Sequence, residues 1–110
     1  MEKVLLFSLQ SDHIKVTIEA FFEDNGNLVI EGYDIGKPVE EYWGDSDYEY
    51  STNVPPDEVD KLYRLFDLPV GSKQLLLDAL RSRYHGDKCY SEIRDFLTEH
   101  QIRHHGFSWT

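Results

Sequence analysis

An acidic and aromatic stretch between residues 31 and 50 holds the side chains best suited to chemistry or recognition in this sequence. Its carboxylates and rings are Glu31, Tyr33, Asp34, Glu40, Glu41, Tyr42, Trp43, Asp45, Asp47, Tyr48, Glu49 and Tyr50, and its single base is Lys37. Tyrosine and tryptophan supply large, rigid contact areas, and clustered carboxylates attract a basic partner. The alternative is that the rings fold back over the sheet edge while the acids face water. The residues that we expect to bind a partner are Tyr42, Trp43, Asp45, Asp47 and Glu49.

The same carboxylates, or a histidine cluster near the C-terminus, could instead hold a metal ion or support catalysis. Residues 45–49 begin like a calcium-binding loop, but Tyr50 stands where the sharp turn needs glycine and Pro56 where a bidentate glutamate is needed. The histidines His100, His104 and His105 lack the spacing of the HExxH zinc motif. We expect no metal site and no cofactor. A small enzyme or metal-binding protein that uses the histidine cluster or the carboxylates of residues 40–49 is the alternative function.

A nucleophilic catalytic group is not expected either. Cys89 is the only cysteine, and it lies on the apolar stripe of an expected helix, where a free thiol behaves as a small buried hydrophobe. The sequence contains no glycine-rich phosphate-binding motif and no nucleophile elbow. A single cysteine also excludes an internal disulfide and fits a reducing cytoplasm. The sequence therefore predicts no catalytic residue.

The elements that must position these side chains begin with strands. Residues 3–9 form a nearly continuous apolar run, typical of a strand buried on both faces, whereas residues 13–23 alternate as a half-buried strand does. Asn25-Gly26 predicts a tight type I′ hairpin turn into a strand over 27–34, because both central residues of that turn need a positive φ. A fourth strand is expected over 48–54.

The second half has the periodicity of helices. Pro55-Pro56 ends the sheet and begins a helix whose apolar stripe is Val59, Leu62, Tyr63 and Phe66. A second helix is expected to begin after Ser72, which would be its N-cap. The side chains that should face the core from this helix are Leu75, Leu76, Ala79, Leu80 and Tyr84. A third helix is expected from about residue 90 to 100, with a stripe that comprises Cys89, Ile93, Phe96, Leu97 and His100. Residues 102–110 alternate again and predict a final strand, with Phe107 and Trp109 buried against the helices.

The expected architecture is a single α+β domain that spans residues 1–110. It comprises a mostly antiparallel, four- to five-stranded sheet with three helices packed on one face, in the order ββββ-ααα-β. Strands and helices do not alternate along the chain, which excludes a nucleotide site at the strand ends of a Rossmann-type sheet.

The charge of the chain limits the kinds of molecule that we expect it to bind. The net charge is −10, and residues 1–60 hold fifteen acidic against three basic side chains. Such a field repels nucleic acid and anionic membranes and attracts basic proteins. No apolar run approaches the roughly 20 residues that a membrane span needs. We therefore expect neither a nucleic-acid nor a membrane partner.

Two segments, EEYWGDSDYEYSTNVPP and SEIRDFLTEHQIRHHGFSW, cover about a third of the chain. They resemble short, acidic, uncharacterised bacterial proteins that carry a YWGDxDYEY-type patch and end in a strand with a tryptophan. Those proteins have no established activity, so the resemblance implies a free-standing bacterial cytoplasmic domain and carries over no site residue.

Together, these observations predict a small, acidic, non-enzymatic module that binds a basic protein surface. An immunity-type inhibitor of a basic toxin is one concrete form of it, and an adaptor is another. We expect it to act in the cytoplasm as a monomer or weak homodimer.

Overall fold

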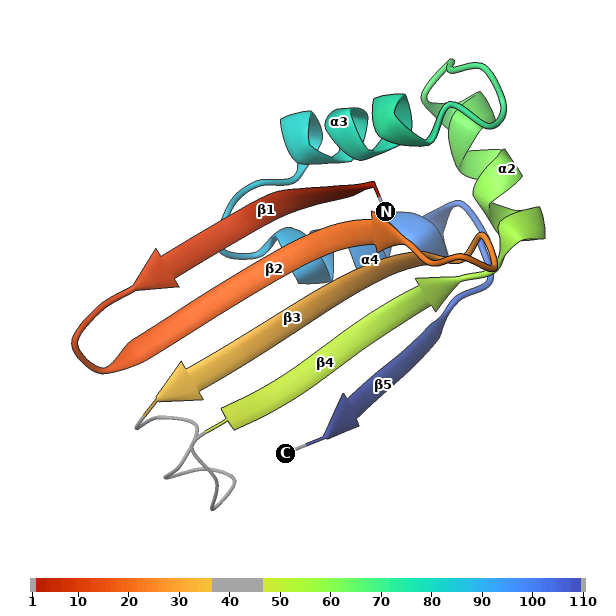
Figure 1. Cartoon of the computed structure of the whole chain (residues 1–110). Coiled ribbons are helices and arrows are strands. Elements are labelled where there is room, and N and C mark those ends of the chain that lie inside the picture. The colour runs from red at the N-terminus through yellow and green to blue at the C-terminus, as the bar shows by residue number, and fades with distance from the viewer. Residues whose placement is uncertain (1, 37–46, 110) are drawn as a thin grey trace.

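The computed structural model describes residues 2–36 and 47–109. Its strands are β1 (Lys3–Gln10), β2 (Ile14–Phe22), β3 (Leu28–Gly36), β4 (Asp47–Val54) and β5 (His105–Trp109), and its helices are α2 (Pro56–Leu65), α3 (Lys73–Arg83) and α4 (Cys89–Glu99). The strands pair antiparallel in the order β1-β2-β3-β4-β5. The helices cover one face of the sheet and leave the other face open (Figure 1). The predicted α+β fold and its ββββ-ααα-β order are confirmed.

The core lies between the sheet and the helices. The alternation of β2 buries Ile18, Ala20 and Phe22 on the helix side, as the sequence predicted. The helices contribute apolar stripes to the same layer, namely Val59, Leu62, Tyr63, Leu76, Leu77, Leu80, Cys89, Ile93, Phe96 and Leu97. Each large aliphatic side chain buried in this way stabilises the fold by about 1.5–3 kcal/mol. No helix in the described ranges is both long enough and apolar enough to span a membrane.

Strand β1 is buried on one face, so the prediction that it is buried on both is wrong. Val4 and Leu6 lie in the core, whereas Leu5 is 49% exposed. The reason is that β1 is an edge strand of a sheet with only one helix-covered face. The register shifts between Leu5 and Phe7, and an irregularity of this kind makes an edge strand a poorer template for pairing with another chain.

The turn between β2 and β3 also differs from the prediction. Gly26 has a φ of 93°, but Asn25 has no positive φ, so the turn is not of type I′. The Gly26 amide donates to the Glu23 carbonyl at 2.9 Å, and the Glu23 amide donates to the Asn27 carbonyl at 2.9 Å. These bonds define a three-residue loop in which a type I turn is followed by a left-handed glycine. Such a loop needs only one residue with positive φ, and glycine supplies it.

Helix α3 turns a different leucine inward than expected. Leu75 is 50% exposed, while its neighbours Leu76 and Leu77 are fully buried. Three consecutive leucines are compatible with two helical stripes, and packing of α3 against β1 and β2 selects the second. Ser72 precedes the helix as predicted, but its hydroxyl bonds the Pro69 carbonyl instead of capping a helix amide.

Strand β5 returns to the sheet beside β4, which confirms the predicted final strand. The prediction that Phe107 is buried against the helices is wrong, because its side chain is 57% exposed. Phe107 pairs with Ser51 on the open face, and the helix-facing positions of β5 belong to Gly106 and Ser108. The side chain of Trp109 lies outside the described part of the structure.

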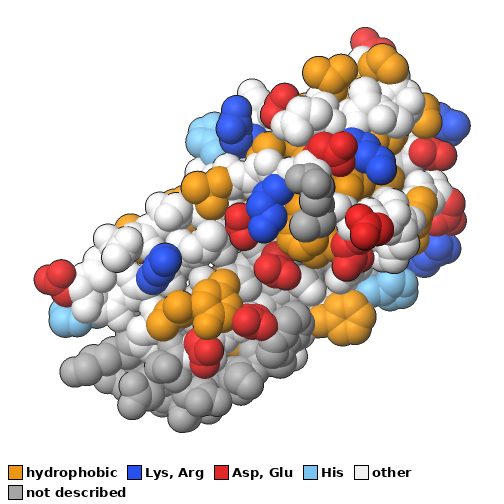
Figure 2. All heavy atoms as spheres, in the orientation of Figure 1, with side chains coloured by type: hydrophobic (Ala, Val, Ile, Leu, Met, Phe, Trp, Pro, Cys, Tyr) orange, Lys and Arg blue, Asp and Glu red, His pale blue; other side chains and the backbone are white. Residues whose placement is uncertain are grey.

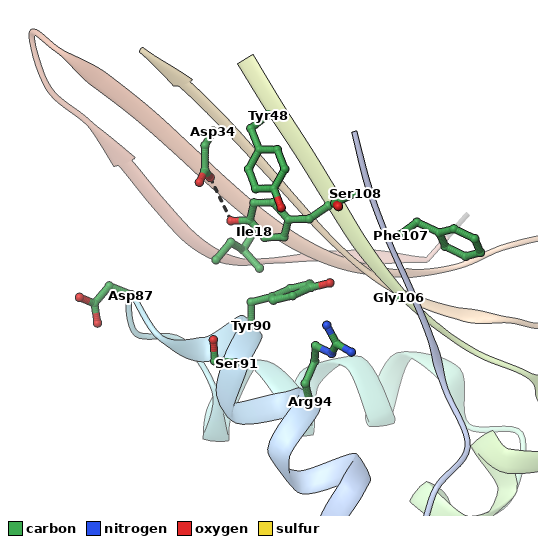
Figure 3. Close-up of a pocket in the computed structure, with 11 residues that line it drawn as sticks. Ile18, Asp34, Tyr48, Asp87, Tyr90, Ser91, Arg94, Gly106, Phe107 and Ser108 are labelled. Carbon is green, nitrogen blue, oxygen red and sulfur yellow. Dashed lines mark hydrogen bonds between the residues drawn. The ribbon is translucent and has the colours of Figure 1, made fainter. Parts of the chain in front are cut away.

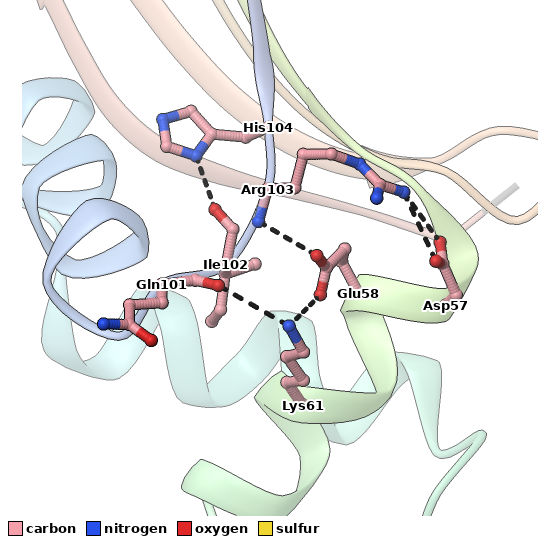
Figure 4. Close-up of polar contacts among 7 residues, drawn as sticks. All are labelled: Asp57, Glu58, Lys61, Gln101, Ile102, Arg103 and His104. Atoms are coloured by element: carbon pink, nitrogen blue, oxygen red, sulfur yellow. Dashed lines mark hydrogen bonds and ion pairs between the residues drawn. The ribbon is translucent and has the colours of Figure 1, made fainter.

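A buried carboxylate on α2 contacts the segment of the chain that leads into β5. Glu58 on α2 is 6% exposed and accepts a hydrogen bond from the Arg103 backbone amide at 3.2 Å. It also pairs with Lys61, whose ammonium reaches the Gln101 carbonyl at 3.5 Å (Figure 4). The bond from Lys61, with that from Arg103, lowers the pKa of Glu58 against the opposing effect of burial. Glu58 thus joins α2 to the segment that precedes β5.

Candidate functional site

The predicted partner-binding residues lie only in part within the described structure. Tyr42, Trp43 and Asp45 lie outside the described residues, whereas Asp47 and Glu49 begin strand β4. Because Tyr48 faces the helices, its two neighbours in the strand face the open side of the sheet. The structure therefore places Asp47 and Glu49 together on one surface.

On this open face, three glutamates from three strands form an acidic row. Glu19 of β2 and Glu31 of β3 are direct cross-strand partners, and Glu49 of β4 lies diagonally beside Glu31. Burial and the charges of Glu19 and Glu49 raise the pKa of Glu31, which Lys3 partly opposes. Like charges placed opposite each other destabilise a sheet. We call Glu19, Glu31 and Glu49 the acidic row.

The surroundings of the acidic row combine a few neutralising contacts with exposed apolar side chains. Lys3 pairs with Glu19 at 3.6 Å, and the hydroxyl of Tyr33 donates to Asp47 at 3.0 Å, which raises the pKa of Tyr33. Leu5 and Phe107 are both about half exposed on this face. Figure 2 shows the face with acidic side chains interspersed among hydrophobic and basic ones. Glu19 was not among the site residues predicted from the sequence, although its place on the polar side of an alternating strand could be read there.

The opposite side of the sheet holds a cavity of about 540 Å³ between α4 and strands β3 to β5 (Figure 3). The sheet and α4 together line it with Ile18, Asp34, Tyr48, Tyr50, Asp87, Tyr90, Ser91, Arg94, Gly106, Phe107 and Ser108. The side chain of Phe107 points away from it. The lining is mostly polar and carries charges of both signs. No local pattern in the sequence predicted this cavity, because its lining comes from strands and a helix that are far apart in the chain.

Tyrosine rings and two hydrogen bonds form the floor of the cavity. The Tyr50 hydroxyl donates to Asp34 at 2.9 Å, and the Tyr50 ring contacts Tyr90 edge to face with centroids 4.7 Å apart. The hydroxyl oxygens of Tyr90 and Thr52 lie 2.7 Å apart. Burial, together with the Asp34 charge, raises the pKa of Tyr50, and burial raises that of Asp34 against the opposing hydrogen bond. Tyr50 therefore remains a neutral hydrogen-bond donor at neutral pH.

Two strand glycines make room for the larger side chains of the cavity. A Cβ atom on Gly32 would lie 2.0 Å from the Tyr50 ring, so the ring lies directly across the backbone of β3. A Cβ atom on Gly106 would lie 3.3 Å from the guanidinium nitrogens of Arg94. Glycine weakens a strand interior, and it often marks a place where another group approaches the backbone closely.

The histidines and the cysteine do not form a chemical site in the described residues. His100 stacks beside Phe96 with centroids 4.3 Å apart, and His104 bonds the Ile102 carbonyl through Nδ1 at 2.8 Å. Within residues 2–36 and 47–109, no three histidine, cysteine or acidic side chains gather as a metal site would require. Cys89 is a free, fully buried thiol whose pKa is raised by burial.

Comparison of the chain with protein-family models, curated proteins and solved structures found no match.

Proposed function

We propose that this protein is a non-enzymatic module that binds a basic protein through the open face of its sheet. The docking surface comprises the acidic row, Asp47 and the exposed apolar side chains Leu5 and Phe107. Tyr42, Trp43 and Asp45, which precede β4 in the sequence, are further partner-binding residues in this proposal. An inhibitor of the immunity type that covers a basic toxin, or an adaptor, would use such a surface.

The observation that carries the proposal is the juxtaposition of three carboxylates in the acidic row by the register of β2, β3 and β4. Glu31 is held beside two like charges, and its pKa is raised as a result of burial and of those charges. Lysine or arginine side chains from a partner would relieve this repulsion, so the free protein stores electrostatic energy that binding releases. Exposed aromatic and aliphatic groups beside the charges supply the apolar contact that a charge pair alone lacks.

The setting that fits this function is a reducing cytoplasm. The single cysteine is a free thiol in the core. A net charge of −10 favours a soluble monomer or a weak homodimer that repels nucleic acid. The resemblance of the two segments described above points to a bacterium.

A lysine-rich peptide titrated into the ¹⁵N-labelled protein tests the proposal. We expect the largest chemical-shift changes at Glu19, Glu31 and Glu49, and an affinity that falls steeply as salt is added, because exposed charges are screened over about 8 Å at physiological ionic strength. Binding should also release protons near the raised pKa of Glu31, which calorimetry in buffers of different ionisation enthalpy detects.

A matched pair of double variants provides the control. Glu31→Gln with Glu49→Gln removes two charges from the open face, whereas Asp95→Asn with Glu99→Gln removes two from α4. Only the first pair should weaken binding. Equal weakening by both pairs would show that the peptide responds to net charge and not to this face, and the proposed surface would be wrong.

A further inference from the structure

We propose that the cavity between α4 and the sheet binds a small, elongated dipolar molecule, with a cationic amine at Asp34 and Asp87 and a carboxylate at Arg94. This is a second site, separate from the proposed docking surface, because the cavity lies on the helix-covered side of the sheet and the acidic row lies on the open side. Its volume of about 540 Å³ is within the range of about 300–1,000 Å³ that small-ligand sites occupy.

The charges of the lining are separated by sign. Asp34 and Asp87 lie on one side of Tyr90, and Arg94 lies on the other (Figure 3). The acidic and basic residues follow the same order along the chain. Asp87 lies just before α4 begins, and Arg94 lies in the middle of that helix. The Arg94 side chain hydrogen-bonds Tyr90, but within the described residues it makes no ion pair, so no carboxylate neutralises its charge.

The strand register gives the distance between the acidic end of the cavity at Asp34 and the basic end at Arg94. Asp34 pairs with Tyr48, and Gly106, against which the guanidinium of Arg94 lies, pairs with Thr52. Four residues along β4 correspond to about 13 Å, and β3 and β5 flank β4 at about 4.8 Å on either side. The two ends are therefore about 16 Å apart at the backbone, before the side chains reach inward. An α-amino acid, whose charges sit on adjacent carbons, is too short to contact both ends.

The walls between the ends suit an extended chain. Tyr48, Tyr50 and Tyr90 present ring surfaces and hydroxyls along its length, and Ser91 and Ser108 add further hydroxyls. Tyr50 is locked by its bond to Asp34, and the space for its ring and for Arg94 depends on Gly32 and Gly106. The sheet therefore sets the position of Asp34, and Arg94 reaches from α4 to the backbone of β5 at Gly106.

Titration of the ¹⁵N-labelled full chain with ε-aminocaproate tests the inference. This probe has an amine and a carboxylate at the ends of a straight chain, and hexylamine and caproate each keep one of the two. Because the site is partly open, we expect a Kd of about 1 mM for ε-aminocaproate. We expect at least about tenfold weaker binding of each single-charge probe, a loss worth about 1.4 kcal/mol. Shifts should occur at Tyr50, Tyr90, Arg94 and Gly106.

Conservative variants test which residues bind the amine and the carboxylate of the probe. Asp34→Asn keeps an oxygen that accepts the Tyr50 hydroxyl, and Arg94→Gln leaves a shorter, uncharged polar side chain at an exposed position, so both should fold. Each should abolish the preference for the dipolar probe, whereas Arg81→Gln on the exposed side of α3 should leave it unchanged. Equal binding of all three probes, a preference that survives both variants, or no shifts in the cavity would overturn the inference. Arg94→Gln should not change binding of the lysine-rich peptide, which separates this result from a failure of the proposed function.

Discussion

At the scale of single residues, a substitution at Glu31 tests the electrostatic repulsion on the open face of the sheet. Its charge is opposed by Glu19 across the strand and by Glu49 on the diagonal. Replacing it by glutamine should stabilise the protein at neutral pH by about 0.5 kcal/mol, the size of a like-charge cross-strand penalty that water partly screens. Urea unfolding at two pH values measures the change.

The pH dependence of that gain has a definite sign. The raised pKa of Glu31 means that the folded state binds the proton more tightly than the unfolded chain does. The ionised carboxylate therefore weakens the native protein above its folded pKa, and protonation removes the penalty as the pH falls below the ordinary value. The gain from Glu31→Gln should be present at neutral pH and vanish in acid. A gain that persists in acid would show that the effect is not electrostatic.

Gly32 provides a second test at the residue scale. Alanine at this position would place its Cβ atom 2.0 Å from the Tyr50 ring, so the ring would have to shift, which disturbs the hydrogen bond from its hydroxyl to Asp34. Overpacking of this kind costs about 1–3 kcal/mol. Gly86→Ala is the matched control, because its Cβ atom would meet nothing within 4 Å and its φ is not positive. Similar unfolding free energies for the two variants would show that Tyr50 moves aside without loss.

At the scale of elements, β5 is held by its backbone pairing with β4 and by Ile102, which lies three residues before the strand begins. Ile102 is 2% exposed, whereas Phe107 is 57% exposed. Ile102→Ala should therefore cost about 2–5 kcal/mol. Phe107→Ala should stay within about 0.5 kcal/mol, as surface substitutions do. Denaturant unfolding of both variants provides the comparison. A larger loss from Phe107 than from Ile102 would mean that the open face is covered in solution.

At the scale of the whole molecule, unbalanced charge is the dominant electrostatic feature. Acidic side chains exceed basic ones by 10. Raising the salt concentration from about 0.01 M to about 0.1 M shortens the screening length from about 30 Å to about 10 Å, which weakens this self-repulsion. The melting temperature should therefore rise with sodium chloride, and it should rise less for the double variant Glu31→Gln with Glu49→Gln. A fall with salt would mean that ion pairs such as Glu58 with Lys61 outweigh the repulsion.

The sequence by itself determined the identity and order of the elements. The alternation of residues 13–23, the prolines at 55 and 56, and the apolar stripe from Cys89 to Leu97 are local patterns. Local backbone and side-chain preferences suffice to read them, because each depends on residues a few positions apart. The same patterns identified Asp47 and Glu49 as acidic positions near aromatic rings, but not the surface that they share.

Only the tertiary structure decided which faces are covered and which distant residues meet. Leu77 instead of Leu75 enters the core, and Phe107 faces outward, because sheet packing selects among faces that are equally apolar in sequence. The acidic row requires the register of three strands, and the contacts of Tyr50 with Gly32 and of Arg94 with Gly106 require the strand order and the position of α4. Register and strand order arise from contacts between residues far apart in the chain, and no local pattern contains them.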